Sequence, residues 1–266
     1  MATQFDPGPA AEPFRKLCET YPGTTIYPAG DFRVEWGPVF YRGRLDGSAR
    51  VLVIGQDPAQ HETVVRRILV GEAGHRIQGF LAKLGIDSSY VMVNAFLYSV
   101  FGQGGGNKHR DNPKIASYRN RWLSALFQNG RIEAVVALGS LAESAWAAWK
   151  RTPEGRRVDV PFVRITHPTQ PEASGRPHAA AIAAMLRNWN EALAQLHPLP
   201  SPDRRRPLKP YGAAFQRGDQ IPIPDFDVPA GVPDWMRLDD GWADRPGHGR
   251  AKRARILVTV PKGRLP

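Results

Sequence analysis

Cysteine is almost absent from this sequence of 266 residues, because Cys18 is its only thiol. One thiol excludes an intrachain disulfide and the four-cysteine sites that bind zinc or an iron–sulfur cluster. Long apolar runs are also missing, so no stretch predicts a membrane-spanning helix. The N-terminus lacks a basic region followed by an apolar run, which argues against a signal peptide. We therefore expect a cytoplasmic protein with a reduced thiol and no membrane association.

Acidic residues are scarce relative to basic ones. The sequence has 25 Asp and Glu against 36 Lys and Arg, which gives a net charge of +11. Such an excess favours a polyanionic partner, most commonly nucleic acid, although a solvated basic surface would have the same composition. Apolar residues make up 42% of the chain, which is enough for a folded core.

Short apolar runs alternate with helical patterns in the middle of the chain. Four runs rich in β-branched residues, each followed by turn-forming residues, predict buried parallel strands. They are Arg50–Ile54, Val91–Val93, Ile132–Leu138 and Phe162–Ile165. Apolar stripes with helical spacing begin at Ile77, Trp122, Leu141 and Ile182. This order predicts an α/β fold, a three-layer αβα sandwich around a central four-stranded parallel sheet. A further helix is expected near Ala10–Tyr21.

The composition changes after position 198. Residues 199–266 contain 11 of the 25 prolines, and 13 Lys or Arg against 8 Asp or Glu. We therefore divide the chain into a main domain at 1–198 and a Pro-rich, basic C-terminal extension at 199–266. Scattered aromatic residues in the extension favour wrapping around the main domain over a disordered tail.

Polar residues follow each predicted strand, at the edge where open parallel sheets bind ligands. They are Gln56-Asp57-Pro58, Asn94, Gly139-Ser140 and Thr166-His167-Pro168. Each group alone is typical of a turn or a helix cap. Their occurrence after four successive strands predicts that they form one site.

These residues carry a resemblance to the uracil-DNA glycosylase superfamily, which covers roughly residues 50–196. Gly55-Gln56-Asp57-Pro58 is similar to the first motif of the family, and His167-Pro168-Thr169-Gln170-Pro171 to its second motif. Asn94 resembles the asparagine that closes the central strand, and Leu138-Gly139-Ser140 the turn that meets DNA phosphate. Val70–Ile86 resembles the iron–sulfur branch instead, whose cluster one cysteine cannot hold.

The resemblance implies that residues 1–198 are a catalytic domain that hydrolyses the N-glycosidic bond of flipped-out uracil in DNA and leaves an abasic site. No cofactor and no metal are expected. Asp57 would activate the water and offset the cationic sugar, and His167 would donate a hydrogen bond to uracil O2. Asn94 would read the edge of the uracil, and Gln56 would contact the base through its backbone. Ser140 would hold a phosphate at a helix N-terminus.

Two positions in the expected uracil pocket depart from the family pattern. Ala59 stands where a tyrosine excludes the methyl group of thymine, which leaves Gln60 and His61 as candidates for that role. Leu69 and Val70 stand where an aromatic residue stacks on uracil. Either an aliphatic side chain packs on the base there, or another aromatic substitutes. The candidates are Phe80, Phe96 and Tyr98.

The expected DNA contacts include the second motif and one loop. Pro171 stands where a leucine enters the DNA stack, so Pro171, Gln170 or a different wedge would fill the gap. Pro168 and Thr169 belong to the same DNA-binding motif. The loop Gly102–Pro113 is either a solvated surface loop or a backbone contact made by Lys108 and Arg110. The same loop contains His109, and one branch of the family has there a histidine that cross-links to the abasic sugar, although the surrounding motif differs.

Several alternatives remain open at this point. The protein would otherwise be a glycosylase for another damaged base, a slow or non-catalytic protein that binds uracil-DNA or abasic DNA, or a domain that binds a phosphorylated small molecule. We expect a monomer whose partners are uracil-containing DNA and the abasic product. The extension would either add DNA affinity, through Arg204–Arg206 and Lys252–Arg255, or brace the fold.

Overall fold

The computed structural model describes residues 5–102, 105–175, 177–246 and 255–263. At its centre lies a five-stranded sheet with the order β1-β3-β2-β4-β5. The strands are β1 (Arg42–Gly43), β2 (Val51–Gly55), β3 (Tyr90–Asn94), β4 (Ala134–Leu138) and β5 (Phe162–Ile165). Strands β2 to β5 are parallel, and they coincide with the four predicted apolar runs.

The expected strand count was one too low. β1 pairs antiparallel with β3, with Arg42 opposite Met92 and Gly43 opposite Val91. Two residues are too few to produce a hydropathy pattern, so the sequence contained no signal for this strand. Gly43 has a φ of 97°, and a Cβ there would lie 2.3 Å from the carbonyl oxygen of Tyr90. The close pairing of this edge strand therefore depends on glycine.

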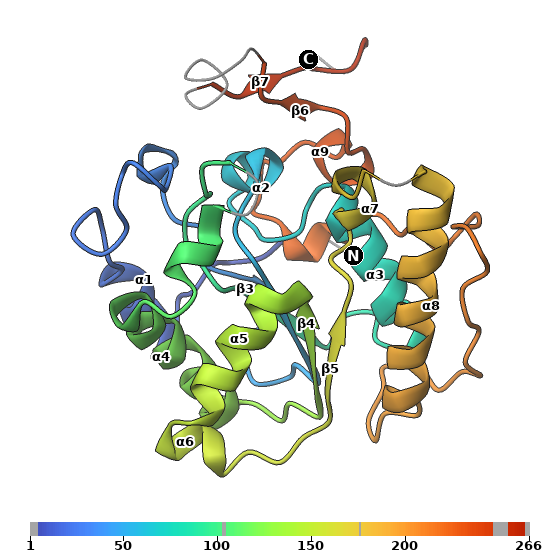
Figure 1. Ribbon diagram of the computed structural model, residues 1–266, viewed down its shortest axis with the longest axis horizontal. Coiled ribbons are helices and arrows are strands. Elements are labelled where there is room, and N and C mark those ends of the chain that lie inside the picture. Colours follow the sequence, from blue (N-terminus) through green and yellow to red (C-terminus); the bar gives the residue numbers. More distant parts are fainter. Residues whose placement is uncertain (1–4, 103–104, 176, 247–254, 264–266) are drawn as a thin grey trace.

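Helices connect the strands and cover both faces of the sheet (Figure 1). They are α1 (Phe14–Glu19), α2 (Gln60–Val65), α3 (Glu72–Lys83), α4 (Pro113–Asn129), α5 (Gly139–Lys150), α6 (Pro153–Arg156), α7 (Gln170–Ala173), α8 (His178–Leu196) and α9 (Trp235–Leu238). The four predicted helical stripes correspond to α3, α4, α5 and α8. Within the described ranges, no helix combines the length and the apolar character needed to cross a bilayer.

Alternate residues of each strand point into two separate apolar layers. In β2, Leu52 and Ile54 pack in the layer formed with α1, α4 and α5. Val51 and Val53 pack in the opposite layer, formed with α3 and α8. This period of two is the geometry of a strand that is buried on both faces. The predicted three-layer αβα sandwich is thereby confirmed, with the addition of the edge strand β1.

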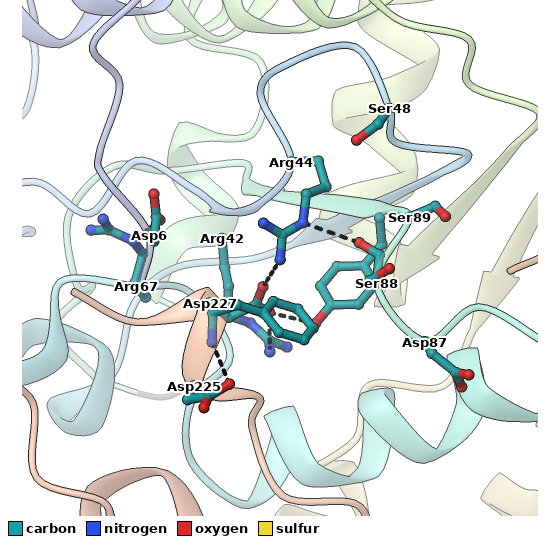
Figure 2. Close-up of polar contacts among 12 residues, drawn as sticks. Asp6, Arg42, Arg44, Ser48, Arg67, Asp87, Ser88, Ser89, Asp225 and Asp227 are labelled. Carbon is teal, nitrogen blue, oxygen red and sulfur yellow. Dashed lines mark hydrogen bonds and ion pairs between the residues drawn. The ribbon is translucent and has the colours of Figure 1, made fainter. Parts of the chain in front are cut away.

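A buried ion-pair network joins residue 227 to the sheet (Figure 2). The side chain of Asp227 is fully buried and accepts hydrogen bonds from Arg42 Nη1 at 3.0 Å and Arg44 Nη2 at 3.1 Å. The hydroxyl of Tyr90 also donates to this carboxylate. A buried carboxylate needs such partners, because an unpaired charge is costly in a medium of low dielectric constant.

An apolar cluster joins residues 223–243 to α2 and to the loop that follows it. Trp235 and Trp242 are buried in it together with Val65 of α2 and Val70. The chain then forms a two-stranded ribbon of β6 (Ala243–Asp244) and β7 (Leu257–Val258). This ribbon lies beyond α2 and α9, at the end of the molecule where α2 and α7 follow their strands (Figure 1).

Candidate functional site

The crevice of this sheet lies at the carboxyl end of β2. The chain passes from β2 to β3 on one side and then crosses to β4 on the other, which makes this end the topological switch point. Four of the predicted polar groups lie here, since Gln56–Pro58, Asn94, Gly139-Ser140 and Thr166–Pro168 end or follow neighbouring strands.

Two glycines show how closely these groups approach one another. A Cβ on Gly139 would lie 2.9 Å from Gln56 Nε2 and 3.6 Å from His167 Cβ. A Cβ on Gly55 would lie 2.2 Å from Asn94 Oδ1, because the two residues are opposite each other in the β2–β3 register. A Cβ at Gly55 would therefore collide with the Asn94 side chain, whereas Gly139 is favoured by its φ of 83°.

Asp57 is held by the loop that follows β3. Its Oδ2 accepts a hydrogen bond from the backbone N–H of Val100 at 2.9 Å. Burial raises the pKa of this carboxyl group from 3.8 to about 6, although the Val100 N–H and the charges of Arg245 and Arg33 act in the opposite direction. Asp57 is therefore mostly ionised at neutral pH, with a pKa close to the range in which a general base works best.

His167 is neutral and has a defined tautomer. Burial lowers its pKa from 6.5 to about 4, so the imidazole carries no charge at neutral pH. Nδ1 accepts a hydrogen bond from the backbone N–H of Thr169 at 3.3 Å and lies 3.1 Å from the Thr169 hydroxyl oxygen. The proton of the neutral ring is therefore on Nε2, which remains a donor. The preceding residue, Thr166, is bound to α8 by two hydrogen bonds. Its backbone N–H donates to Asn188 Oδ1 at 2.7 Å, and its carbonyl oxygen accepts from the indole N–H of Trp189.

Asn94 presents an amide without a partner. It ends β3 and is 9% exposed, and its Nδ2 has no hydrogen-bond partner among the described residues. The backbone around it is fixed, since Ala95 N–H donates to Gly55 O at 3.0 Å and Phe96 N–H to Gln56 O at 2.9 Å. A buried donor without a partner is uncommon, and it is available to an incoming ligand.

The loop that contains the other pocket positions is fastened by Glu62, which the sequence did not single out. The Glu62 carboxylate accepts from the backbone N–H of Ala59 and, at 3.0 Å, from that of Leu69. Glu62 is 7% exposed, and burial raises its pKa to about 7. Leu69 has a φ of 55°, an unfavourable conformation for leucine that the bond from its N–H to Glu62 helps to hold. Leu69 and Val70 are both buried and apolar, whereas Ala59 is partly exposed.

The aromatic residues proposed as substitutes for the stacking partner lie in the core. Phe80 packs edge-on against Trp189 at 5.6 Å between ring centroids. Phe96 packs against Phe32 at 5.4 Å, and Tyr98 against Tyr27 at 4.9 Å. All three candidates are at most 2% exposed. Leu69 and Val70 are also at most 4% exposed, so burial does not distinguish among these candidates.

A cleft of about 440 Å³ lies on the β4–β5 side of the rim. Its lining includes Gln56, Gly139, Ser140, His167 and Gln170, but neither Asp57 nor Asn94. Ser140 is exposed in the first turn of α5, a helix of 12 residues. Backbone N–H groups at such a helix start favour an anion.

The second motif, His167–Pro171, contains both buried and exposed residues. Pro168 is buried, and its carbonyl oxygen accepts a hydrogen bond from Arg76. Pro171 is also buried in the first turn of α7, whereas Gln170 is exposed. In this conformation Gln170, and not Pro171, is the residue that protrudes. Arg76 also pairs with Glu172 at 2.9 Å, which fastens α7 to α3.

The basic loop is attached to Asp31. Lys108 forms an ion pair with Asp31, and His109 Nε2 lies 2.9 Å from Asp31 Oδ2. The pKa of Asp31 is lowered, first of all by its hydrogen bond with Lys108. Arg110 donates to Asn107 Oδ1 at 3.2 Å. The Lys108 side chain is exposed, so its ammonium is accessible despite this pairing.

Two of the basic groups in the extension lie far from this rim. Arg204 and Arg206 both pair with Asp87 at 2.9 Å, beside the amino end of β3. Of the group Lys252–Arg255, residues 252–254 lie outside the described residues. Arg245, which the sequence did not single out, is the residue of the extension whose charge acts on Asp57.

Metal ligands are not clustered at the site. No group of three or more His, Cys, Asp or Glu side chains within the described part of the chain is arranged to hold a metal ion.

Comparison with known proteins gives one match. The family model described as "Uracil DNA glycosylase superfamily" matches residues 42–206, which include Asp57, Asn94 and His167. No curated protein matches the chain significantly.

Proposed function

Because the chain belongs to the uracil DNA glycosylase superfamily, we propose that it removes uracil from DNA by hydrolysing the bond between base and deoxyribose. The observation that carries this proposal is the state of three side chains at the carboxyl ends of β2, β3 and β5. Asp57 has a pKa of about 6, His167 is neutral with its proton on Nε2, and the Nδ2 of Asn94 is buried without a partner. Each state is the one that glycosidic cleavage of uracil needs.

Asp57 acts on the water and on the sugar. The Val100 N–H orients one carboxylate oxygen, and the other is left to accept a proton from the attacking water. The transition state of glycosidic cleavage resembles an oxocarbenium ion, and the negative carboxylate stabilises the positive charge on the sugar. Water loses one proton to Asp57, and its oxygen forms the new bond to the anomeric carbon as the bond to the base breaks.

His167 acts on the leaving base. Uracil departs with negative charge on O2, and the Nε2–H of a neutral imidazole donates a hydrogen bond that strengthens as this charge develops. A pKa of about 4 keeps the ring neutral through the whole neutral range, so this donor does not titrate there. Thr169 holds the ring in this orientation through Nδ1.

Asn94 selects the base. Its Nδ2 donates to uracil O4, and its Oδ1 accepts from N3–H. Cytosine has a donor at position 4 and an acceptor at N3, so it would face the amide with both groups mismatched. Leu69 and Val70 are the apolar side chains at the positions where the family pattern packs a side chain on the ring.

DNA binding outside the pocket involves the rim. Ser140 at the start of α5 binds a phosphate, and the exposed Gln170 of the second motif lies beside the gap left by the flipped nucleotide. These contacts offset the few kcal/mol that base flipping costs. Ala59 favours a second substrate class as well, because its methyl group leaves room for a substituent on C5 of the pyrimidine where the family has tyrosine.

The test is alkaline cleavage of end-labelled DNA that contains one uracil, with EDTA present. The wild type is compared with Asp57→Asn and with Asp159→Asn, which removes an exposed carboxylate from the loop before β5. We expect cleavage by the wild type and Asp159→Asn, and a loss of about 10²- to 10⁴-fold in Asp57→Asn. DNA with cytosine, thymine or a 5-substituted uracil serves as the specificity panel. Absence of wild-type cleavage, together with tight binding to abasic DNA, would replace this proposal with a non-catalytic binding function.

A further inference from the structure

The helix that follows Asp57 is covered by the C-terminal part of the chain. In the first turn of α2, Gln60 Nε2 donates to the carbonyl oxygen of Ala243 at 3.4 Å. The ring of His61 meets the ring of Trp242 edge-on, with 4.7 Å between the centroids. Trp242 is only 2% exposed, and its indole N–H donates to the Met236 carbonyl at 3.0 Å. Residues 236–243 are therefore anchored on α2 by buried contacts.

This anchoring brings Arg245 to Asp57. Arg245 comes two residues after Ala243, a separation of at most about 7 Å between Cα atoms, and Ala243 contacts Gln60. Gln60 is itself three residues from Asp57. The Arg245 guanidinium is near enough for its positive charge to lower the pKa of Asp57 against the effect of burial.

Arg245 is free to bind an anion. It is partly exposed, and within the part of the chain that the structure describes its guanidinium has no carboxylate in ion-pair distance. Arg33, the other cation that acts on Asp57, is 3% exposed and donates to Ser99 Oγ and the carbonyl of Val100. Of these two cations, only Arg245 is accessible from the rim.

We propose that Arg245 binds a DNA phosphate beside the flipped nucleotide, which makes the C-terminal segment around β6 part of the active site. This inference rests on the proposed function. Deoxyribose in DNA carries a phosphate on each side, and a carboxylate at its anomeric carbon repels both. A guanidinium next to that carboxylate offsets this repulsion, and its planar donors match two phosphate oxygens.

A purely electrostatic role on Asp57 is the competing explanation, and it has different consequences. A phosphate contact releases a counterion and changes the salt dependence of DNA binding. A guanidinium that only keeps Asp57 ionised changes the acid limb of the pH–rate profile and leaves the salt dependence as it is. The two roles are therefore separable in one set of variants.

The experiment compares Arg245→Ala and Arg245→Lys with Arg205→Ala. Arg205 is an exposed arginine of the same extension, and its side chain donates to Pro200 O at the opposite edge of the sheet. Binding to duplex DNA with an abasic-site analogue is measured by fluorescence anisotropy over a range of salt concentrations, in an Asp57→Asn background. We expect Arg245→Ala to reduce the slope of log K against log salt by about 0.9, the value for one phosphate contact. Arg245→Lys and Arg205→Ala should keep the slope of the parent.

A second arm identifies the phosphate. In two further DNA substrates, one or the other phosphate beside the target nucleotide is replaced by a neutral methylphosphonate. One of these replacements should weaken DNA binding by the Asp57→Asn parent. The same replacement should not change DNA binding by the variant that also carries Arg245→Ala. An unchanged salt slope in Arg245→Ala would overturn the proposal. If the acid limb of the pH–rate profile also shifted, the role of Arg245 would be the electrostatic one on Asp57. Because these binding arms need no catalysis, they stay decisive if the wild type does not cleave uracil-DNA, a result that would instead count against the proposed function.

Discussion

Replacing Asp57 with asparagine should remove the activity and yet stabilise the folded protein above pH 6. Burial raises the pKa of this carboxyl group from 3.8 to about 6, so the folded protein holds the proton more tightly than the unfolded chain does. The contribution of Asp57 to stability is therefore full below pH 4 and is lost as the pH rises through 6. Asparagine does not titrate, and its side-chain oxygen still accepts from the Val100 N–H.

The size of the effect follows from this pKa difference. About two pH units at 1.36 kcal/mol each give about 3 kcal/mol as the upper limit for the gain at pH 8. At pH 4 the gain should fall below about 1 kcal/mol, because this pH lies close to the pKa of 3.8 in the unfolded chain, where ionisation favours unfolding only slightly. Glu62 adds to the gain at pH 8, since the charge of Asp57 raises the pKa of this second buried carboxyl group.

Urea unfolding followed by tryptophan fluorescence, at pH 4 and pH 8, measures both values for the wild type and Asp57→Asn. The pH dependence of the single-turnover rate of the wild type should show an acid limb with a midpoint near pH 6. Equal stability of the two proteins at pH 8, or an acid limb with a midpoint near pH 4, would refute the reasoning. Either result would mean that the Asp57 carboxylate is solvated in the folded protein.

Three further substitutions test the packing around the site. Gly55→Ala places a Cβ 2.2 Å from Asn94 Oδ1 and so displaces the amide, which should cause a large loss of kcat/KM on uracil-DNA. Unaltered kinetics would mean that the Asn94 amide is not held where it reads the base. Glu62→Gln keeps one acceptor for two backbone N–H groups, which should cost about 1–3 kcal/mol in urea unfolding and lower the cleavage rate; a variant with wild-type stability would contradict this. Asp227→Ala leaves Arg42 buried without its acid and should cost about 3–5 kcal/mol; a loss below 1 kcal/mol would show that the pair is not buried in solution.

The parallel strands and the long helices of this fold could be predicted because each is long enough for its pattern to be visible. The run Arg50–Ile54 corresponds to β2, and the stripe that begins at Ile77 corresponds to α3, which stops just before Gly85 at a φ of 78°. The edge strand β1 has two residues and depends on a turn of the chain at Gly43, so it has no period to detect. Its partner in the sheet is set by tertiary contacts alone.

In the candidate site, too, some residues could be predicted from local sequence and others could not. Asp57, Asn94 and His167 end or follow β2, β3 and β5, so the rule that ligands bind at the carboxyl ends of parallel strands assigned them to the same edge of the sheet. Glu62 stands in the first turn of α2, where an acid is ordinarily solvated, and its burial depends on how the loop to Leu69 folds back. The charge of Arg245 acts on Asp57 although 188 positions separate them in the sequence, and no local pattern indicates such an interaction.

Basic residues in the extension illustrate why charge alone did not indicate where the proposed phosphate contact lies. The run Arg204–Arg206 is denser in charge than the chain around Arg245, yet two of its members pair with Asp87 at the amino end of β3. A charge cluster in a sequence predicts a basic surface, but the edge of the sheet at which it lies depends on the path of the chain. The isolated Arg245 reaches the site because Trp242 anchors the segment before it.

The same anchoring decides how the role of the extension can be tested. Removal of residues 199–266 would take away Asp227, which neutralises the buried Arg42, and Trp242, which packs in one cluster with Val65 and Val70. Such a truncation leaves a buried charge without its partner and exposes apolar surface, so a loss of DNA binding would follow from misfolding as readily as from a lost phosphate contact. Substitution of Arg245 changes one partly exposed guanidinium and leaves both anchors in place. A point substitution with a salt-slope readout therefore separates recognition from folding at this interface, whereas deletion cannot.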